Sequence, residues 1–470
     1  MKHTKAIYCQ IFVFLYFYFK NFEFFSKQNI WYDDAHELLI SKVSIFDPLT
    51  FIRVADHHLG FSIVLKIVLS IVGIKYIYLV LSFIFISLFC SIGYILSRKF
   101  DNSISILLVQ IIFLTSSTFI NYSFRPKQYV YDFLIVVALI YFLDNYKYSL
   151  IKLIMLTICC FIFSNILIIY FIYPIFQQLR KQNLNYKNVI YLVVLIPFGV
   201  NSFLKITNIN FNSYWNDFYS NNIFDIERFF YNSILFLRSF LDLGYLFIVF
   251  LVIFSGVIIL FKNNKNLFFL NTIPLFIILF LNLLNIYPLG GGRTDIILFP
   301  FIFYSIYYLL ASCKKEFFIN TLAVVFIVYV SFTNLDTQNE KVDNTKFVLN
   351  EIDIEKFDKV FISFYSIPQV ALHSQDIIEL KFENNKCLYR SKNKKIVLLS
   401  KTNDNSCIPE NNLNKLETSI TKKENIAVLG FDSNTQNIQK YIKNLDFTDF
   451  RTEVKKFGNQ EFLFKAYSSG

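Results

Sequence analysis

Acidic residues able to do acid–base chemistry are densest just after the first apolar segment of the chain. Asp33 and Asp34 are adjacent, and Glu37 follows them in the stretch 31–37. If this stretch is helical, Glu37 shares a face with both aspartates, because residues three and four apart are neighbours on a helix. Carboxylates this close repel one another, so one can hold a proton or the group can bind a cation. Either state suits a general base or a divalent-metal site, and the plainer alternative is a solvated helix with an acidic first turn.

A second polar group, Asp56-His57-His58, directly precedes an apolar run at 59–73. Asp56 has a side chain suited to capping a helix that begins there. The two histidines could bind a phosphate, orient a carboxylate or ligate a metal. Adjacent residues point to different faces of a helix, so a metal site made by this pair alone is not expected. Polar residues resting at a membrane surface are the plainer alternative.

Cations occupy two later turns. The arginine–proline turn (residues 125–129) holds Arg125, Lys127 and Tyr129, and its proline suits the first turn of the following helix. The glycine–arginine turn (residues 290–293) ends on Arg293, whose planar guanidinium matches a phosphate. Glycines in that turn let the backbone approach a ligand closely. The plainer alternative is a flexible turn whose arginine reaches back to the interface.

Together these groups suit transfer from a lipid-linked phosphate donor. Asp33 or Asp34 would deprotonate or orient the acceptor hydroxyl. A phosphate leaving group would be stabilised by the cations. We therefore predict Arg125, Lys127 and Arg293 as phosphate-binding residues, and a substrate-binding set consisting of Glu37, Asp56, His57, His58 and Tyr129.

The composition places these residues in a membrane protein. The 470 residues are 55% hydrophobic and 17% charged, with a net charge of +11. Soluble proteins average about 45–50% apolar and about 25% charged residues. The basic excess lies between apolar segments, so binding to nucleic acid is not predicted. Apolar runs of membrane length, which must be helical in lipid, number about eleven. They are 7–25, 76–97, 103–122, 128–144, 149–163, 165–179, 187–206, 236–261, 267–286, 295–312 and 316–333.

Basic residues crowded into short turns predict the orientation. They share one side if the apolar run 59–73 lies along the interface and does not cross. The N-terminus is then cytoplasmic, and the outer side holds the first loop (26–75), the loop 207–235 and the turn 287–295. We expect a multi-pass protein of the plasma (inner) membrane. The predicted transmembrane domain is 1–333, and the predicted extracytoplasmic domain is 334–470.

The polar C-terminal region predicts a small α/β domain. Short strands are expected at Lys359–Tyr365, Lys395–Ser400, Asn425–Phe431 and Glu461–Tyr467, with a helix at Thr435–Leu445. The predicted fold class is therefore an all-α polytopic membrane protein with a C-terminal α/β domain. Cys387 and Cys407 are the cysteines of this region, and an extracytoplasmic location permits a disulfide between them without requiring it.

The order of these motifs resembles the GT-C superfamily of multispanning glycosyltransferases over residues 7–333. The resemblance is greatest to the branch of protein O-mannosyltransferases, lipid A aminoarabinose transferases and RgtA-like lipopolysaccharide sugar transferases. That branch carries an acidic pair, usually Asp-Glu, after its first span, where this chain has Asp33 and Asp34. It then carries a His-Pro-Pro-Leu-like stretch, where the segment 56–60 lacks both prolines. Arg125-Pro126 with Tyr129 and the run from Arg293 to Pro300 resemble its later motifs.

The resemblance implies a polyprenyl-phosphate-linked sugar as donor and inverting transfer outside the cytoplasm. It also implies that Asp33, the first acidic residue, is the catalytic base. Members of the superfamily differ in metal use, so a divalent metal is possible and no cofactor is certain. The acceptor is a lipid, a glycan or a protein, and membrane lipids surround the enzyme. The alternatives are a polysaccharide polymerase or ligase, which favours a very large outer loop, and a lipid-linked-glycan transporter, which needs ionisable residues near the bilayer midplane.

Overall fold

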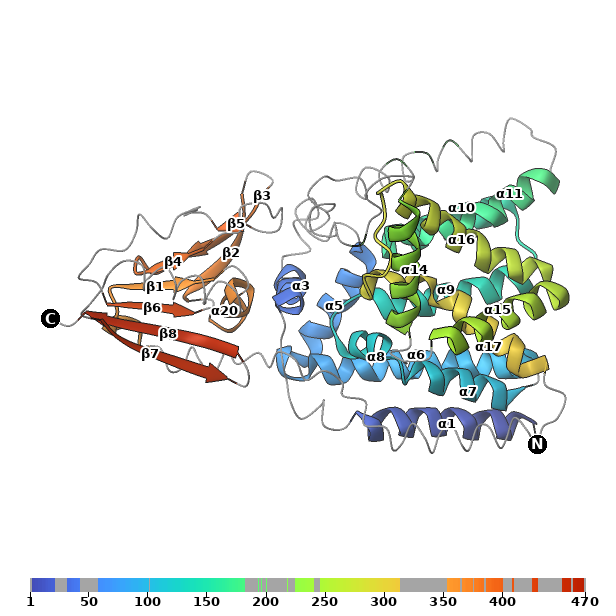
Figure 1. Cartoon of the computed structure of the whole chain (residues 1–470), viewed down its shortest axis with the longest axis horizontal. Coiled ribbons are helices and arrows are strands. Elements are labelled where there is room, and N and C mark those ends of the chain that lie inside the picture. Colours follow the sequence, from blue (N-terminus) through green and yellow to red (C-terminus); the bar gives the residue numbers. More distant parts are fainter. Residues whose placement is uncertain are drawn as a thin grey trace. The chain divides into compact units, whose positions relative to one another are not determined.

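The computed structural model of the chain divides into two compact units, and each is described by itself (Figure 1). The first unit is Met1–Ser26 with His57–Thr337, and the second is Lys27–Asp56 with Gln338–Gly470. The segment 27–56 of the predicted first outer loop thus groups with the C-terminal residues. The structure describes residues 2–21, 32–42, 58–100, 102–181, 193, 196, 200, 218, 225–240, 246–312, 353–363, 366–374, 376–383, 386–399, 408–409, 425–429, 450–457 and 460–468.

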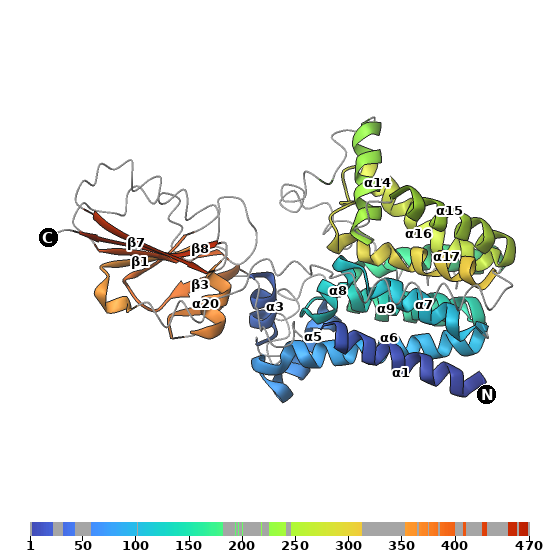
Figure 2. The same cartoon turned by 60° about the horizontal axis from the view of Figure 1, so that its bottom comes forward.

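The first unit is a helical bundle, in which α1, α6 and α7 pack side by side (Figures 1 and 2). Its described α-helices are α1 (Lys2–Lys20), α5 (Leu59–Val72), α6 (Ile77–Phe100), α7 (Ser103–Phe113), α8 (Ser117–Phe124), α9 (Tyr129–Asn145), α10 (Leu150–Phe163), α11 (Ile172–Lys181), α14 (Ile226–Phe240), α15 (Leu246–Asn263), α16 (Lys265–Leu283) and α17 (Phe299–Ser312). Short 3-10 segments join some of them, namely η1 (Ile74–Tyr76), η2 (Asn165–Phe171) and η4 (Arg293–Leu298).

Within the described residues, three helical segments are long and apolar enough to cross a membrane. They are Ile74–Phe100, Lys265–Leu283 and Arg293–Ser312, and α7 with α8 makes a fourth if that bent pair is one span. The shorter apolar helices are Leu59–Val72, Leu150–Phe163 and Phe250–Asn263. The predicted spans 187–206 and 316–333 lie outside the described helices, so the total of about eleven stays a prediction.

Two predicted spans are each divided between two helices. The run 103–122 bends by 84° between α7 and α8. The Ser116 hydroxyl accepts a hydrogen bond of 3.2 Å from the Phe119 amide, which caps α8 and favours a new helix at this point. Hydroxyl side chains compete with the helical backbone for its hydrogen bonds. A hydropathy average does not detect a serine that acts in this way. The run 236–261 likewise begins in α14, which ends at Phe240, and continues in α15.

Aromatic rings form the centre of the bundle. Phe113, Phe119 and Phe133 are fully buried, and their ring centroids lie 5.0 to 5.3 Å apart. Helices α15 and α17 lie in close contact at Gly256, where an added Cβ would lie 2.1 Å from the Ser305 carbonyl oxygen. Helices in lipid associate through such close packing, because lipid offers no hydrophobic driving force between them. The bundle is therefore held by ring stacking and by a small residue at a helix contact.

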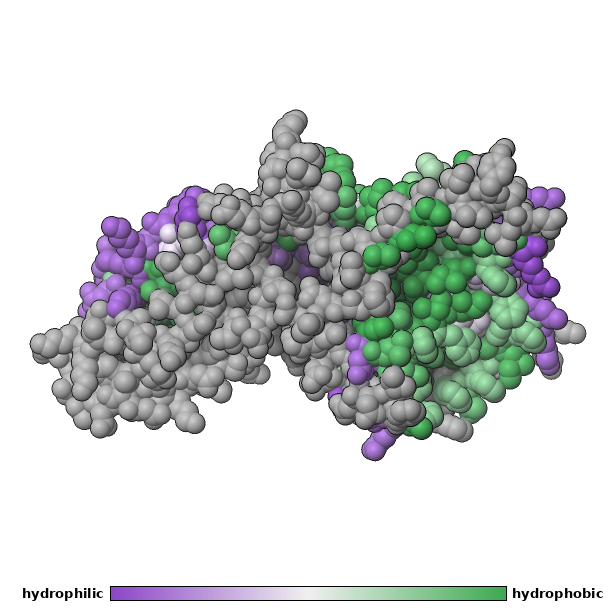
Figure 3. All heavy atoms as spheres, turned by 90° about the horizontal axis from the view of Figure 1, so that it is seen from above, coloured by the Kyte–Doolittle hydropathy of each residue, from purple (hydrophilic) through white to green (hydrophobic). Residues whose placement is uncertain are grey.

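Hydrophobic side chains cover much of the described surface of the bundle (Figure 3). Phe19, Ile71, Phe176 and Phe276 are examples, and each has more than half of its surface exposed. An exposed apolar surface of this extent suits contact with lipid tails and would be costly in water.

The second unit contains two sheets and two described α-helices, α3 (Tyr32–Lys42) and α20 (Ile367–His373). The five-stranded sheet has the order β4-β1-β6-β8-β7, with parallel pairs at β4–β1–β6 and antiparallel pairs at β6–β8–β7. The three-stranded sheet has the order β2-β3-β5. The strands are β1 (Lys359–Ile362), β2 (Ile378–Glu383), β3 (Lys386–Ser391), β4 (Ile396–Leu398), β5 (Ile408–Pro409), β6 (Ile426–Leu429), β7 (Phe450–Phe457) and β8 (Gln460–Ser468), with η5 (Ile354–Lys356) before β1.

The predicted strand segments correspond to β1, β4, β6 and β8, which all belong to the five-stranded sheet. Strand β6 is buried at every position, as expected for a short apolar run inside a sheet. The β2–β3 hairpin, β7 and α20 were not predicted, although the sequence of β2, IELKFE, alternates strictly between apolar and charged residues, which is a strand signal. The predicted helix 435–445 lies outside the described residues. So does Cys407, and the Cys387 side chain is not described, so their pairing stays a prediction.

Candidate functional site

Helix α16 identifies the two ends of the bundle. At its N-terminus Asn264 and Asn266 each donate a hydrogen bond of 2.9 Å to the Asp144 carboxylate, near the end of α9. Beyond its C-terminus the Tyr287 hydroxyl donates to the Thr294 carbonyl of η4 over 3.1 Å. A helix of 19 residues is about 28 Å long. Asp144 and Thr294 therefore lie at opposite ends, and η4, which contacts α9, lies where α9 begins.

Helices α5 and α10 meet the same end of the bundle. The Ser164 hydroxyl, just after α10, donates to the Asp132 carboxylate in α9 over 2.9 Å. Gly60 of α5 lies so close to Phe163 that an added Cβ would be 2.9 Å from the Phe163 Cα. His58 occupies the N-cap position of α5, two residues from this contact. The structure thus brings His58, the arginine–proline turn and the glycine–arginine turn to one end of the first unit.

The arginine–proline turn begins where α8 ends. Arg125 has extended backbone angles (φ −84°, ψ 150°), as expected for a residue before proline. Its guanidinium lies 5.2 Å from the centroid of the Tyr122 ring, within cation–π range. Tyr129 packs edge-on against the same ring. Lys127 is buried, with 7% of its surface exposed. The turn therefore places two cations beside a pair of tyrosine rings at this end of the bundle.

The glycine–arginine turn is shaped by a buried carboxylate. Asp295 accepts hydrogen bonds from the backbone amides of Gly290 (2.9 Å) and Gly292 (3.0 Å). Both glycines have positive φ, at +86° and +69°, which side chains disfavour. An added Cβ at Gly292 would meet nothing nearer than Thr118, at 3.9 Å. Asp295 therefore has a structural role, holding the turn that presents Arg293 at the start of η4.

Asp132 is a buried acid that the sequence analysis did not assign to the site. It lies one turn into α9, is 3% exposed, and its Oδ1 atom has no hydrogen-bond partner among the described residues. An ionisable group buried in an apolar helix is costly and usually functional. Its isolation within the apolar run 128–144 was the available signal. Asp132 therefore joins the polar groups at this end of the bundle.

The predicted carboxylates belong to the second unit. Asp34 and Glu37 lie on α3 and are buried, which excludes the solvated-helix alternative for these two side chains. Asp33 is in the same helix, and its side chain is not described. Asp56 and His57 lie outside the described residues. Within the described residues, no group of three His, Cys, Asp or Glu side chains could hold a metal ion.

The sequence-predicted residues therefore fall into two groups. His58, Arg125, Lys127, Tyr129 and Arg293 belong to the first unit, whereas Asp33, Asp34 and Glu37 belong to the second. That the two groups form one cavity stays a prediction.

Apolar helices of membrane length and cationic turns at one end of the bundle define the first unit as a membrane-protein bundle, and a separate α/β unit accompanies it. The particular likeness is to the crystal structure of ArnT from Cupriavidus metallidurans bound to undecaprenyl phosphate. It covers 99% of this chain and 98% of the ArnT chain, with a TM-score of 0.54 and 7% sequence identity. The likeness supports the predicted GT-C-like fold, and the count of eleven spans stays a prediction. No protein-family model matches the chain, and no curated protein matches it.

Proposed function

We propose that this chain is a membrane glycosyltransferase that transfers a sugar from a polyprenyl-phosphate donor to an acceptor outside the cytoplasm. The observation that supports it is the ArnT-like fold, which extends over nearly the whole chain. The ArnT structure holds undecaprenyl phosphate, a polyprenyl phosphate without a sugar. That is the product expected when a donor of this class has given up its sugar.

The cationic turns are the proposed phosphate site. Arg125, Lys127 and Arg293 lie at the same end of the bundle, where α9 and η4 begin. When the bond between the anomeric carbon and the phosphate oxygen breaks, negative charge develops on that oxygen. Fixed cations stabilise this charge more in the transition state than in the bound donor, and they therefore lower the barrier. Tyr129 and His58, at the same end, are proposed to contact the donor headgroup.

The acidic helix α3 is the proposed source of the base. A carboxylate of Asp33 or Asp34 takes the proton from the acceptor hydroxyl, whose oxygen forms the new bond to the anomeric carbon. Attack from the face opposite the leaving phosphate inverts the configuration. Glu37, Asp56 and His57 are proposed to orient the acceptor. For transfer to occur, the acceptor bound by the acidic helix must reach the donor bound by the cationic turns.

The end of the bundle that carries the cationic turns is proposed to be extracytoplasmic, with the N-terminus in the cytoplasm. Asp144 and the basic residues near Asn264 would then lie at the cytoplasmic end, as the positive-inside rule favours. The length of α5 fits this orientation. Its 14 residues span about 21 Å, less than the hydrocarbon thickness.

The decisive experiment supplies the purified protein in liposomes with a panel of radiolabelled polyprenyl-phosphate sugars and a membrane extract as acceptor. Transfer predicts that one label leaves the lipid and that free polyprenyl phosphate appears in equal amount. The Asp33→Asn protein is the matched control and should release label at least about 100-fold more slowly. Movement of an intact labelled lipid between leaflets without loss of sugar would instead indicate a transporter. If every label stayed on its lipid, the proposed function would be wrong.

A further inference from the structure

Helix α3 is docked within the second unit on the C-terminal part of the chain. It packs against α20, a short helix that precedes β2. From Asp34 to Ser41 every side chain of α3 is buried except that of His36, which is half-buried. A connecting helix in a solvated loop would have one exposed face. The burial of α3 on its described sides therefore indicates that it has a fixed position within the second unit.

A side-chain hydrogen bond joins the docked helix to a residue that is distant in sequence. His36 Nδ1 and the Tyr389 hydroxyl are 3.0 Å apart, and they come from positions 353 residues apart in the chain. Tyr389 is 2% exposed and lies on β3. Strand β3 is the middle strand of the three-stranded sheet, paired to β2 on one side and to β5 on the other. The hydroxyl is thus held by a strand that is fixed on both sides.

Burial raises the pKa of the Tyr389 phenol, so the hydroxyl keeps its proton at neutral pH. It can then donate to Nδ1 of a neutral imidazole, and it can accept from the same atom of a protonated one. The contact therefore persists in both states of His36, as expected of a positioning contact.

The burial of Asp34 and Glu37 gives the docking a functional meaning. Both side chains are buried, so the residues packed around them hold them in place. The two residues are three apart, so they share one face of α3. Acidic residues kept in a docked helix are held in one orientation, which a catalytic base requires.

We infer that Tyr389 is a positioning residue that acts through His36 to hold α3 in place, so that the C-terminal region serves as the platform for the acidic helix. The catalytic part of this inference rests on the proposed function. The docking part rests on the geometry of the second unit alone.

Hydrogen exchange in the full-length protein tests the docking. Tyr389→Phe removes one hydroxyl and keeps the ring, so the core remains packed. A hydrogen bond contributes about 1 kcal/mol net to stability. Its loss should therefore speed amide exchange in residues 32–42 about fivefold. Unchanged exchange across these residues would overturn the inference.

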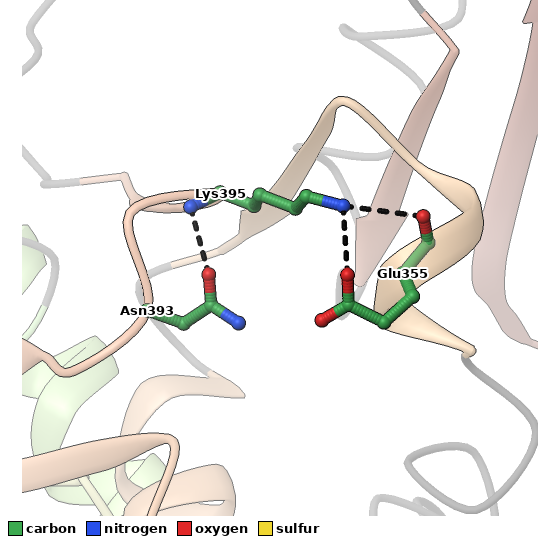
Figure 4. A network of polar contacts seen from close by, with 3 residues as sticks. All are labelled: Glu355, Asn393 and Lys395. Atoms are coloured by element: carbon green, nitrogen blue, oxygen red, sulfur yellow. Dashed lines mark hydrogen bonds and ion pairs between the residues drawn. The ribbon is translucent and has the colours of Figure 1, made fainter.

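The matched control is a polar contact of the same unit away from α3. Lys395 Nζ lies 3.1 Å from the Glu355 carboxylate and donates to the Glu355 carbonyl, while its backbone amide donates to the Asn393 side chain (Figure 4). The Glu355 side chain is 80% exposed. Glu355→Gln should leave exchange in residues 32–42 unchanged, because exposed ion pairs contribute little.

Transfer kinetics test the positioning role. Tyr389→Phe should lower kcat about fivefold and leave KM for the donor unchanged, because the donor phosphate binds elsewhere. The double variant His36→Ala/Tyr389→Phe should be no slower than His36→Ala, since the hydroxyl acts through the imidazole. Additive losses or a raised donor KM would contradict the inference. Absence of transfer by the wild-type protein would count against the proposed function, and the exchange result would still decide the docking.

Discussion

At the scale of single residues, the surroundings of each aspartate decide its role. Asp295 is buried, and its two oxygens accept from two backbone amides, so its charge is used to shape a turn. Asp132 is also buried, but its Oδ1 atom has no hydrogen-bond partner among the described residues. Asp34 sits on a docked helix between two further acids. Residue type alone cannot separate these roles, because the hydrogen-bond partners come from other parts of the chain.

Replacement of the proposed base should greatly slow transfer. Asp33→Asn keeps the size of the side chain and removes its ability to take a proton. General-base catalysis contributes about 10²- to 10⁴-fold to a rate. We expect kcat to fall within that range, measured as label released per minute at saturating donor, while the thermal unfolding midpoint is unchanged. Full activity of Asp33→Asn would rule out Asp33 as the base. The Asp34→Asn variant would then test Asp34 in the same assay.

Replacement of the proposed phosphate ligand should weaken use of the donor. Arg293→Ala removes a cation that stabilises the leaving phosphate, and loss of one such contact costs about 10²-fold. We expect a fall of that size in kcat/KM for the polyprenyl-phosphate sugar, with KM for the acceptor unchanged. Arg293→Lys should recover part of the loss, because lysine keeps the charge without the planar fork. An unchanged dependence on donor concentration in the alanine variant would contradict the role.

At the scale of helices and turns, the turns decide which side chains come together. The Arg125 backbone is extended because a proline follows it, so α8 ends there and α9 begins anew. The glycine–arginine turn relies on positive φ at two glycines and on the Asp295 carboxylate. Both turns lie at the same end of the bundle because α16 separates them from Asp144 by its whole length. Local turn chemistry and helix length together therefore assemble the cationic end.

Two glycine substitutions should separate backbone strain from steric clash. Gly290 and Gly73 both have positive φ, +86° and +68°, but an added Cβ at Gly290 would lie 2.6 Å from the Leu235 Cβ. At Gly73 an added Cβ would meet nothing within 4 Å. Gly73→Ala should cost about 1 kcal/mol of strain, and Gly290→Ala about 2–4 kcal/mol, because overpacking adds to strain.

Thermal unfolding in detergent, followed by size-exclusion chromatography, measures both variants. Equal losses of stability in the two would mean that α14 does not press on the glycine–arginine turn.

Two units of different chemistry make up the molecule at its largest scale. The first is a helical bundle with a largely apolar surface, whereas the second is an α/β unit that includes α3 from the beginning of the chain. The sequence places the acids and the cations on the same predicted side, and the structure assigns them to different units.

Alkaline unfolding should report on the buried Tyr389. The pKa of its phenol is higher in the folded protein than in the unfolded chain, because burial disfavours the phenolate. The stabilising effect is complete below the unfolded pKa of about 10 and is lost as the pH rises above it, by up to about 1.4 kcal/mol per pH unit. Between pH 10 and 11 the wild type should therefore lose more stability than Tyr389→Phe, measured by denaturant unfolding at each pH. Parallel curves for the two proteins would show that Tyr389 is accessible to solvent.

Hydropathy by itself determined much of the architecture. Apolar runs such as 76–97 and 267–286 had to be helices, because a backbone in lipid must satisfy its own hydrogen bonds. They correspond closely to α6 and α16. Four strand segments were also recognisable, because β-branched and apolar residues cluster in them. The cationic turns were visible as charges beside proline and glycine.

Tertiary structure decided what depends on partners distant in sequence. The break after Phe113 depends on the cap made by Ser116, which a hydropathy window averages away. The burial of Asp132 depends on α10, which brings Ser164 to it. The docking of α3 depends on Tyr389, more than three hundred residues later. Composition and periodicity record what a segment prefers for itself, whereas these contacts exist only once the chain has folded.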